Sequence, residues 1–428
     1  MRTTLFFISV MASVCRRKTT SGAGNDYISQ LPAELKESIL ELLSTREAAK
    51  MAMLSTHWKD VWYAHGHLVF DYDFFSYFPP VGFEDEPGDY MEIINRCLML
   101  RMGSVKKFTL GLSEGEQQRL YVFIPLPLPA YINRWCTFLS RNGIEELRIS
   151  VDNCSRTYKL QDCIITCPTI KQLLLGGFVF GFPANSHSVF PGVTSLVFEY
   201  IEFQPDLTGT VYNVPNLEKL SFENCAGIDN FVINAPKLKC LTTNYNYENL
   251  TDSRWFVLHF TVISTLHLQA DLLWHMPDAV AAVTFPSATN LEVFVINNVD
   301  FIYTKHFTFV IELIQKCPKL CELRIETGNY YGQGDYEEED ASRILEYPYS
   351  FVIKKELQLL KTVKMSVFHG YRLEVLFVKS ILLNSPALEE LVITKAPHGQ
   401  GALEIPEEIM CSPRSSPKAQ VLFLEYKY

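Results

Sequence analysis

The sequence has a low share of charged residues, fewer basic than acidic ones, and no long uninterrupted apolar segment. Charged residues make up 20% of its 428 residues, and 38 Lys and Arg are outnumbered by 48 Asp and Glu, which gives a net charge of −10. Because nucleic-acid phosphates are bound by basic surfaces, this balance argues against a nucleic-acid partner. The apolar run of residues 5–15 is too short to cross a bilayer and no other stretch is long enough, so we expect no membrane partner.

The sequence also lacks the layout of a secreted, disulfide-linked protein. A secretory signal carries its positive charge before the apolar run, whereas here the basic residues 16–18 follow it. Met11 offers a second start, and we interpret residues 1–25 as a disordered leader and linker. The 11 cysteines are scattered along the chain and do not form a dense framework. We therefore expect reduced thiols in a cytoplasmic or nuclear protein.

The sequence contains none of the motifs that common classes of enzyme need. There is no G-x-x-x-x-G-K-[ST] phosphate loop, no H-E-x-x-H, no G-x-S-x-G and no G-x-G-x-x-G. Two Cys-x-x-x-Cys pairs, which begin at Cys163 and Cys317, have no second ligand pair nearby, so we interpret them as small apolar residues before strands. His57, His65 and His67 cluster without a recognisable nucleophile or carboxylate. We expect no catalytic residue, metal or cofactor.

The negative charge is concentrated in two short runs that we expect to be solvated loops. Without these nine residues the net charge would be −1, so the main body is nearly neutral. The alternative is an acidic docking patch for a basic partner. One run contains Glu84, Asp85, Glu86 and Asp89, and the other contains Asp335, Glu337, Glu338, Glu339 and Asp340.

Residues 26–66 have the pattern of three short amphipathic helices. Asp26 or Ser29 can cap the first helix, Pro32 suits its first turn, and Thr45 can cap the second. The apolar residues of the first helix share one face, and the third helix holds two Trp. Such a module has a marginal core, so we expect it to bury surface against a partner or the following domain. The face consists of Leu31, Leu35, Ile39, Leu42 and Leu43, and the third helix contains Trp58, Val61 and Trp62.

This segment resembles an F-box, whose outline is Leu-Pro, an Ile-Leu helix, a hydrophobic–Leu-Ser run and a Trp. The Arg-Arg or Cys-Arg that often precedes the Trp is replaced here by residues 56–57. The resemblance implies docking on the Skp adaptor of an SCF (Skp–cullin–F-box) ubiquitin ligase. Whether Leu35, Ile39 and Leu42 belong to the partner surface or to the module's own core stays open. The residues that the resemblance assigns to the adaptor-facing surface or its support are Leu31, Pro32, Ile39, Leu40, Leu54 and Trp58.

The rest of the chain repeats an apolar-x-x-apolar-x-apolar pattern. Successive copies are spaced by 24 residues on average, a period typical of leucine-rich repeats. Each copy predicts a short strand, often begun by a Pro two residues before the first apolar position, and stacked strands predict a parallel sheet in a curved solenoid. After Ala288 the spacing becomes irregular, and Tyr303–Gln315 predicts a helix. The copies open at Val105, Ile144, Ile170, Val193, Leu217, Leu238, Ile263, Ala288, Leu320, Leu360 and Leu388.

The residues that alternate with the buried positions are candidates for contact with a target protein. They are expected on the concave strand surface, although ordinary solvated positions remain the simpler interpretation of any single one. These candidates are Arg148, Lys219, Ser221, Glu223, Glu322 and Arg324.

The C-terminal residues resemble the FBD segment that follows the F-box and leucine-rich repeats in a large plant family. The resemblance implies a strand containing Val363, Met365 and Val367, a turn at Gly370, a helix over 373–383 and a closing strand within 415–426. We expect this segment to cap the open edge of the solenoid.

The sequence therefore predicts an α/β protein with four parts. These are a leader (1–25), an F-box (26–66), a leucine-rich-repeat solenoid (67–345, with an acidic insertion at about 328–342) and an FBD-like segment (346–428). The resemblance implies a non-catalytic substrate receptor, bound through the Skp adaptor to cullin, that presents an unknown target protein. The alternative is a repeat protein that binds proteins without engaging the ligase.

Overall fold

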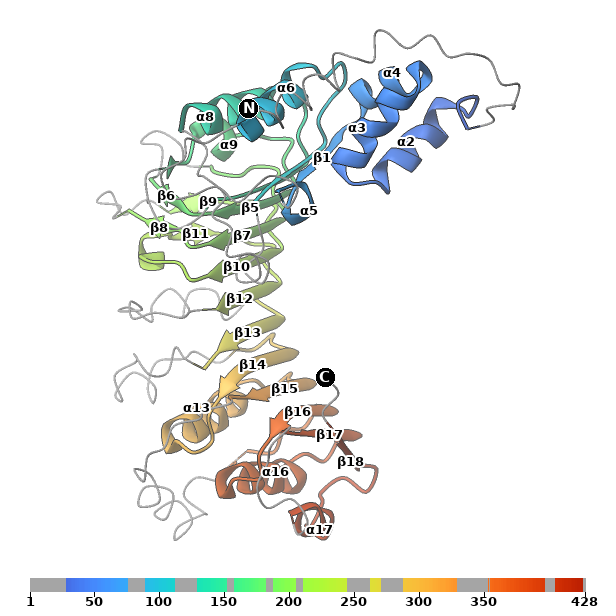
Figure 1. The fold of residues 1–428 in the computed structure, drawn as a ribbon. Coiled ribbons are helices and arrows are strands. Elements are labelled where there is room, and N and C mark those ends of the chain that lie inside the picture. Colours follow the sequence, from blue (N-terminus) through green and yellow to red (C-terminus); the bar gives the residue numbers. More distant parts are fainter. Residues whose placement is uncertain are drawn as a thin grey trace. The chain divides into compact units, whose positions relative to one another are not determined.

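The structure, a computed structural model, describes most of the chain outside its first 27 residues. The described residues are 28–75, 89–111, 129–151, 158–181, 188–204, 211–244, 262–270, 288–328, 353, 355–396 and 405–425. The chain forms two compact units, residues 1–215 and 216–428. Each contains a parallel sheet with helices packed against it, which confirms the predicted α/β class (Figure 1).

The described part of the first unit begins with three helices, α2 (Ala33–Glu41), α3 (Thr45–Leu54) and α4 (Thr56–Ala64). The predicted capping residues differ from those observed. Ser44 caps α3 by accepting the Glu47 N–H at 3.3 Å, and no side chain caps α2. Because the helix end is already satisfied by Ser44, the Thr45 hydroxyl is left to accept the Val69 N–H of the following strand at 2.7 Å. Asp26 lies outside the described residues, and Ser29 pairs with the hydroxyl of Ser55.

The sheet of the first unit contains five strands that follow one another in chain order, all parallel. Alternation aligns their apolar residues in register, so that Leu68, Phe108 and Leu147 form one buried row. Helices α6 (Asp89–Met99) and α8 (Pro129–Arg141) lie side by side against it (Figure 1). The strands are β1 (His67–Phe70), β2 (Lys107–Leu110), β3 (Glu146–Ser150), β5 (Gln172–Gly176) and β7 (Ser195–Glu199).

Smaller elements complete the first unit. They are α5 (Tyr72–Phe75), α9 (Asp162–Ile165), the three-stranded sheet β4 (Tyr158–Lys159), β6 (Phe178–Phe180) and β8 (Glu202–Phe203), and the short strand β9 (Tyr212–Asn213).

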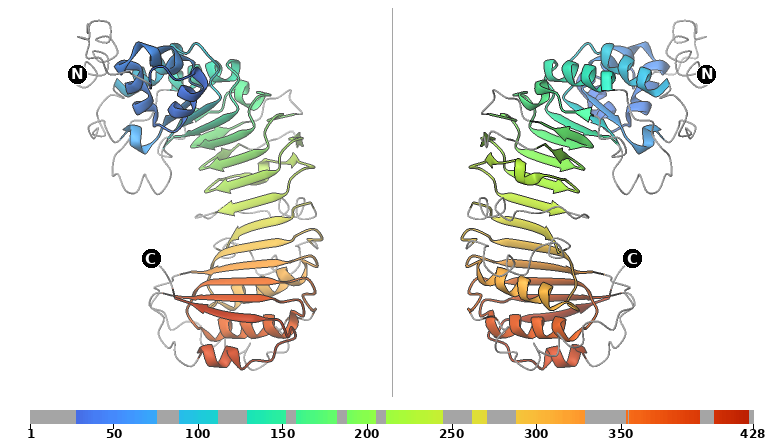
Figure 2. Two further views of the ribbon diagram at one scale, coloured as in Figure 1. Left: turned by 90° about the vertical axis from the view of Figure 1, so that its right-hand side faces the viewer. Right: turned by 90° about the vertical axis from the view of Figure 1, so that its left-hand side faces the viewer.

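The sheet of the second unit is built in the same way. Its described part contains eight parallel strands that follow one another in chain order. Helices α13 (Thr304–Gln315) and α16 (Arg372–Asn384) lie over the same face of this sheet (Figure 2), and the short helix α17 (Ile405–Met410) packs on α16. Helix α13 was predicted from apolar spacing, and α16 was expected from the resemblance to the FBD segment. The strands are β10 (Lys219–Glu223), β12 (Cys240–Asn244), β13 (Thr265–Gln269), β14 (Val293–Val299), β15 (Glu322–Thr327), β16 (Thr362–Phe368), β17 (Glu390–Lys395) and β18 (Gln420–Leu424). A 3₁₀ turn (Ile228–Asn230) and β11 (Ile233–Asn234) lie between β10 and β12.

The repeat pattern was predicted correctly in its period but not in every detail. In every described copy except the one predicted to open at Ala288, the opening residue is buried and lies two residues before its strand, as Ile170 does before Gln172. In the copy predicted to open at Ala288, Leu291 holds this position, because β14 begins at Val293. The repeat prolines, such as Pro168, stand in the turn four residues before the strand and do not begin the strand itself.

The C-terminal segment extends the sheet and does not cap it. Strands β16, β17 and β18 pair in parallel with their neighbours in the same register as the repeats before them. The described part of the segment therefore adds three further repeat-like strands, in place of the expected cover over the sheet's edge. The acidic insertion predicted at about 328–342 lies almost entirely outside the described residues. In the described part of the chain, no helix is long and apolar enough to span a membrane.

Candidate protein-interaction surfaces

Helix α2 turns its apolar stripe toward solvent. Leu35 is 52% exposed and Leu42 is 87% exposed, while Ile39 between them is half-buried. These residues are spaced i, i+4 and i+7, so they lie on one face of the helix. The adjacent face is packed into the module and holds Lys36 and Leu40, which are 7% and 0% exposed. The side chains left in water are thus ones that a folded monomer would normally bury.

The six residues assigned to the adaptor surface divide into two groups. Pro32 is exposed at the start of α2, and Leu31 and Ile39 are half-buried beside it. Leu40 and Trp58 are instead core residues, with the Lys36 ammonium 5.8 Å from the Trp58 ring centre. They support the surface from below, because packing against Trp58 fixes α2 in place. The side chain of Leu54 lies outside the described residues.

Arg101 joins the helical module to the first sheet. Its guanidinium lies over the Trp62 ring at 4.1 Å and donates to the backbone oxygens of Trp62 and His65 at the end of α4. Its Nε donates to the Cys97 oxygen of α6 at 2.8 Å. A cation is favourable at a helix C-terminus, where carbonyl groups are left without helical partners. The same arginine thus satisfies the ends of two helices that belong to different parts of the first unit.

His65 lies within this junction and is held neutral. Burial, the charge of Arg101 and the nearby His67 lower its pKa to about 4. His57 is exposed in the first turn of α4, and His67 is half-buried in β1. The ring centres of His65 and His67 are 5.7 Å apart, so these two histidines lie close together although one is buried and the other half-buried.

A hollow of about 560 Å³ lies on the face of the second sheet opposite α13 and α16. Arg324 and Lys364 are direct neighbours in the register of β15 and β16 and lie at its centre. Glu322 holds Arg324 with an Nε–Oε1 distance of 2.7 Å, and Val392 and Leu424 supply apolar walls. Like charges on neighbouring strands repel each other, so Arg324 and Lys364 do not stabilise the sheet. Their positive charge is instead available for binding a partner.

The other predicted target-contacting residues lie elsewhere on the strands. Arg148 reaches to 3.9 Å from Glu199 in the first unit. Lys219 is exposed on β10, and Ser221 donates to Glu223 two residues along the same strand at 3.5 Å. Of the predicted target-contacting residues, Arg324 is the one that lines the described hollow, and Glu322 is its ion-pair partner.

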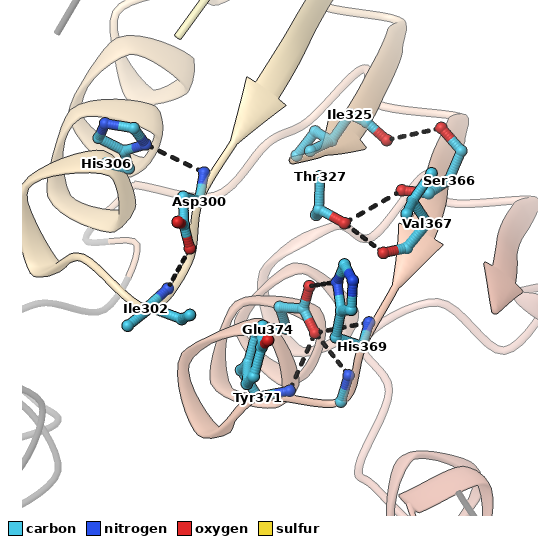
Figure 3. Close-up of polar contacts among 11 residues, drawn as sticks. Asp300, Ile302, His306, Ile325, Thr327, Ser366, Val367, His369, Tyr371 and Glu374 are labelled. Carbon is cyan, nitrogen blue, oxygen red and sulfur yellow. Dashed lines mark hydrogen bonds and ion pairs between the residues drawn. The ribbon is translucent and has the colours of Figure 1, made fainter. Parts of the chain in front are cut away.

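The second unit also contains a buried polar cluster between α13 and α16 (Figure 3). Glu374 is fully buried and its Oε2 accepts three consecutive backbone N–H groups, from His369, Gly370 and Tyr371, at 2.6–3.1 Å. The φ of Gly370 is +86°, a left-handed conformation that lets the three N–H groups converge on one oxygen. This arrangement caps α16 with its own third residue.

Two strands have a bulge near this cluster, β14 between Ile296 and Val299 and β16 between Met365 and Phe368. The φ of Val367 is +62°, which is strained for a β-branched residue, and the Thr327 hydroxyl donates to its carbonyl oxygen. Asp300 lies at the end of β14, where its N–H donates to His306 Nδ1 at 3.0 Å. Burial raises the pKa of Asp300, and the charge of Glu374 raises it further. Burial lowers the pKa of His306 to about 4, and Lys305 adds to this effect.

We expect the substitution His306→Asn to weaken the acid sensitivity of the second unit. An unfolded histidine has a pKa of about 6.5, so the neutral buried form stabilises fully above pH 6.5 and its contribution is lost as the pH falls toward 4. Asp300 acts in the opposite direction, because its raised pKa favours the protonated folded form. Asparagine keeps an acceptor for the Asp300 N–H but does not titrate. Denaturant midpoints measured from pH 7.5 to pH 4.5 report the free energy of unfolding. The loss of this free energy over that range should therefore be smaller in the variant, by up to about 3 kcal/mol. An equal pH dependence in His306→Asn, exposed-site control His57→Asn and unmodified protein would contradict this role.

The described residues offer no recognisable site for catalysis or a metal. No group of three His, Cys, Asp or Glu side chains among them is placed to hold a metal ion. Cys167 and Cys317 are 3% and 2% exposed and lie in the turns before β5 and β15, where they fill space as small apolar residues.

The comparisons with known proteins match both the helical module and the repeats of the chain. The F-box domain model matches residues 28–66, and a leucine-rich-repeat model described as FBD-associated F-box protein At5g56370, LRR repeats, matches residues 132–313. The Arabidopsis thaliana F-box/FBD/LRR-repeat protein At1g13570 is 25% identical over 94% of this chain and 100% of its own length. The chain thus contains an F-box domain and FBD-associated leucine-rich repeats, and it is similar to plant F-box/FBD/LRR-repeat proteins.

Two further Arabidopsis thaliana relatives align with about half of the chain. F-box/LRR-repeat protein At3g26922 is 24% identical over 52% of this chain and 68% of its own length. FBD-associated F-box protein At1g60410 is 27% identical over 47% of each. The joining of an F-box to leucine-rich repeats is the architecture of F-box substrate-receptor proteins, and none of these relatives is named as an enzyme.

Sequence reasoning missed several features of this F-box protein. Helices α6 and α8 were not predicted, although both have apolar residues at helical spacing. The junction made by Arg101 has no signal in the sequence, because Arg101 and Trp62 are distant along the chain. The pairing of Arg324 with Lys364 follows from strand register across an insertion whose length no repeat period predicts.

Proposed function

We propose that this F-box protein is the non-catalytic substrate-recognition subunit of an SCF ubiquitin ligase. Its F-box docks on a Skp adaptor, and through the adaptor on cullin, while its repeats hold a target protein for ubiquitination. The observation that carries the proposal is the apolar stripe of α2, which stays in solvent although its spacing is that of a core-facing helix. A partner helix or groove that covered Leu35, Ile39 and Leu42 would gain about 2 kcal/mol per side chain from burial.

The repeats contribute proximity to this function. A target held on the open face of the second sheet would have its lysines kept near the transfer machinery, which raises their effective concentration without any bond being made by this chain. The hollow around Arg324 and Lys364 combines charge with apolar walls, as the centre of a protein-binding site does. Such a ligase subunit would act in the cytosol or the nucleus.

The double substitution Leu35→Asp/Leu42→Asp is expected to weaken binding to a recombinant Skp adaptor at least tenfold. Both side chains are largely in water in the free protein, so the thermal midpoint should change little, while two desolvated carboxylates oppose the interface. Isothermal titration calorimetry with the full chain provides the affinity. A matched control is Leu359→Asp/Leu383→Asp. It makes the same two changes at exposed leucines of the second unit, which are 45% and 50% exposed.

The outcome separates the proposal from its alternative. Adaptor binding by the unmodified chain and the control, with loss in the α2 variant, supports the ligase function. An unmodified chain that does not bind any Skp adaptor would leave a repeat protein that binds partners outside the ligase. Unchanged affinity in the α2 variant would show that the apolar stripe is not the docking surface.

A further inference from the structure

A groove of about 420 Å³ lies along the outer side of α6 and α8 in the first unit. The C-terminal residue of α6, Met99, forms one part of the groove, and α8 contributes Arg134, Thr137, Phe138 and Arg141. Figure 1 shows the two helices side by side. The groove is separate from the stripe on α2 and from the hollow on the second sheet, and the proposed function assigns it no role.

The charge of the groove is opposite to that of the chain. The two arginines are exposed, and the described residues that line the groove include no carboxylate, although the whole chain carries a net charge of −10. Within the described residues, neither Arg134 nor Arg141 has an ion pair, whereas Arg96 on α6 is paired with Glu92 at 2.9 Å. Two unneutralised guanidinium groups in one groove are suited to carboxylate recognition.

The folded chain leaves apolar side chains in water at the end of α6 and just after it, beginning with the groove residue Met99. Met99, Leu100 and Met102 are 37%, 51% and 79% exposed. Methionine and leucine at an exposed position next to a groove favour a partner that brings its own apolar residues, because methionine adapts to varied shapes. The Met102 N–H donates to the Tyr63 oxygen at 2.9 Å, so Met102 adjoins the end of the F-box helix α4.

We propose that this groove binds an acidic amphipathic helix of a partner protein. Arg134 and Arg141 are seven residues apart on α8 and lie on the same helical face, about 10.5 Å apart along the axis. A partner helix that carries Asp or Glu seven residues apart presents carboxylates at the same interval, with its apolar residues directed at Met99 and Phe138. The groove thus provides a second protein-binding surface beside the F-box, specific for acidic helices.

A selection experiment on the full chain tests this assignment without a known partner. The probe is a displayed library of randomised 18-residue helical peptides, selected on the unmodified protein and then on Arg134→Glu/Arg141→Glu. We expect enrichment of peptides with two acidic residues seven positions apart and apolar residues between them. By fluorescence anisotropy, such a peptide should lose at least tenfold in affinity on Arg134→Glu/Arg141→Glu. A peptide with lysine at the two acidic positions should bind that variant in preference to the unmodified protein.

Controls distinguish this groove from general electrostatic attraction. Lys355→Glu/Lys418→Glu makes the same change in net charge at exposed positions of the second unit and should leave the affinity unchanged. Several outcomes would overturn the proposal: no enrichment of acidic helices, equal binding to the arginine variant, or equal loss in the lysine control. Arginine-dependent binding to phosphatidylserine vesicles without peptide binding would also overturn it, in favour of a lipid surface.

Discussion

Replacing Glu374 by alanine is expected to lower the local stability of the second unit by about 3 kcal/mol, since the carboxylate accepts three backbone N–H groups in a fully buried position. The substitution leaves those donors without their acceptor and removes the cap of α16. Because repeat proteins are stabilised mainly by contacts between neighbouring repeats, the loss should be largest in α16 and β16. Amide hydrogen exchange of residues 362–384 measures this loss directly.

Two further variants show whether the carboxylate acts as proposed. Glu374→Gln keeps an acceptor oxygen and should cost less than alanine. Glu407→Ala removes an exposed carboxylate from the short helix α17 and should cost almost nothing. If Glu374→Ala exchanged at the same rate as Glu407→Ala throughout α16, the three-donor site would not be a stabilising feature.

Replacing Arg101 by alanine is expected to loosen the F-box from the first sheet, at a cost of about 3 kcal/mol in local stability. The guanidinium donates to oxygens at the ends of α4 and α6 and covers the Trp62 ring, and no neighbouring described side chain can take over all of these contacts. The end of α4 should exchange its amides faster. Lysine should restore only part of the loss, because an ammonium cannot bridge the two helix ends as a planar fork does.

The Arg101 variant also has a functional consequence that rests on the proposed ligase role. The α2 stripe is remote from Arg101 along the chain, so affinity for the Skp adaptor should change by less than about twofold. Ubiquitin transfer to a bound target should slow, because the F-box would no longer be held in one orientation to the first repeats. Arg372→Ala, at an exposed arginine of α16, is the matched control. Unaltered amide exchange at the end of α4 in the Arg101 variant would contradict the bridging role.

The general architecture could be predicted because it depends on apolar residues that recur at regular intervals along the chain. The opening residues of the repeats, such as Leu217 and Leu238, recur at a regular interval and precede strands that align in register. Helix α13 was predicted for the same reason, since its apolar residues recur at helical spacing, whereas α16 was expected from the resemblance to the FBD segment. The exception at Ala288 shows the limit, because an insertion moved the equivalent position to Leu291.

The candidate surfaces were predictable only in part. Glu322 and Arg324 were placed on the open strand face by alternation, but the hollow also needs Lys364, which comes from the next strand in space. Leu40 and Trp58 were assigned to the adaptor surface or its support, and the structure places them in the core beneath it. A sequence motif identifies which residues matter together, whereas their exposure depends on the packing of other helices.

The sequence alone determined that this protein combines an F-box with leucine-rich repeats, since both follow from residue types at fixed spacing. Only the tertiary structure decided which faces remain uncovered. The stripe of Leu35 and Leu42 is exposed because Lys36 and Leu40 take the inner side of α2, where they pack with Trp58. Periodicity reports which residues share a face, but what covers that face is set by contacts between residues far apart in the chain.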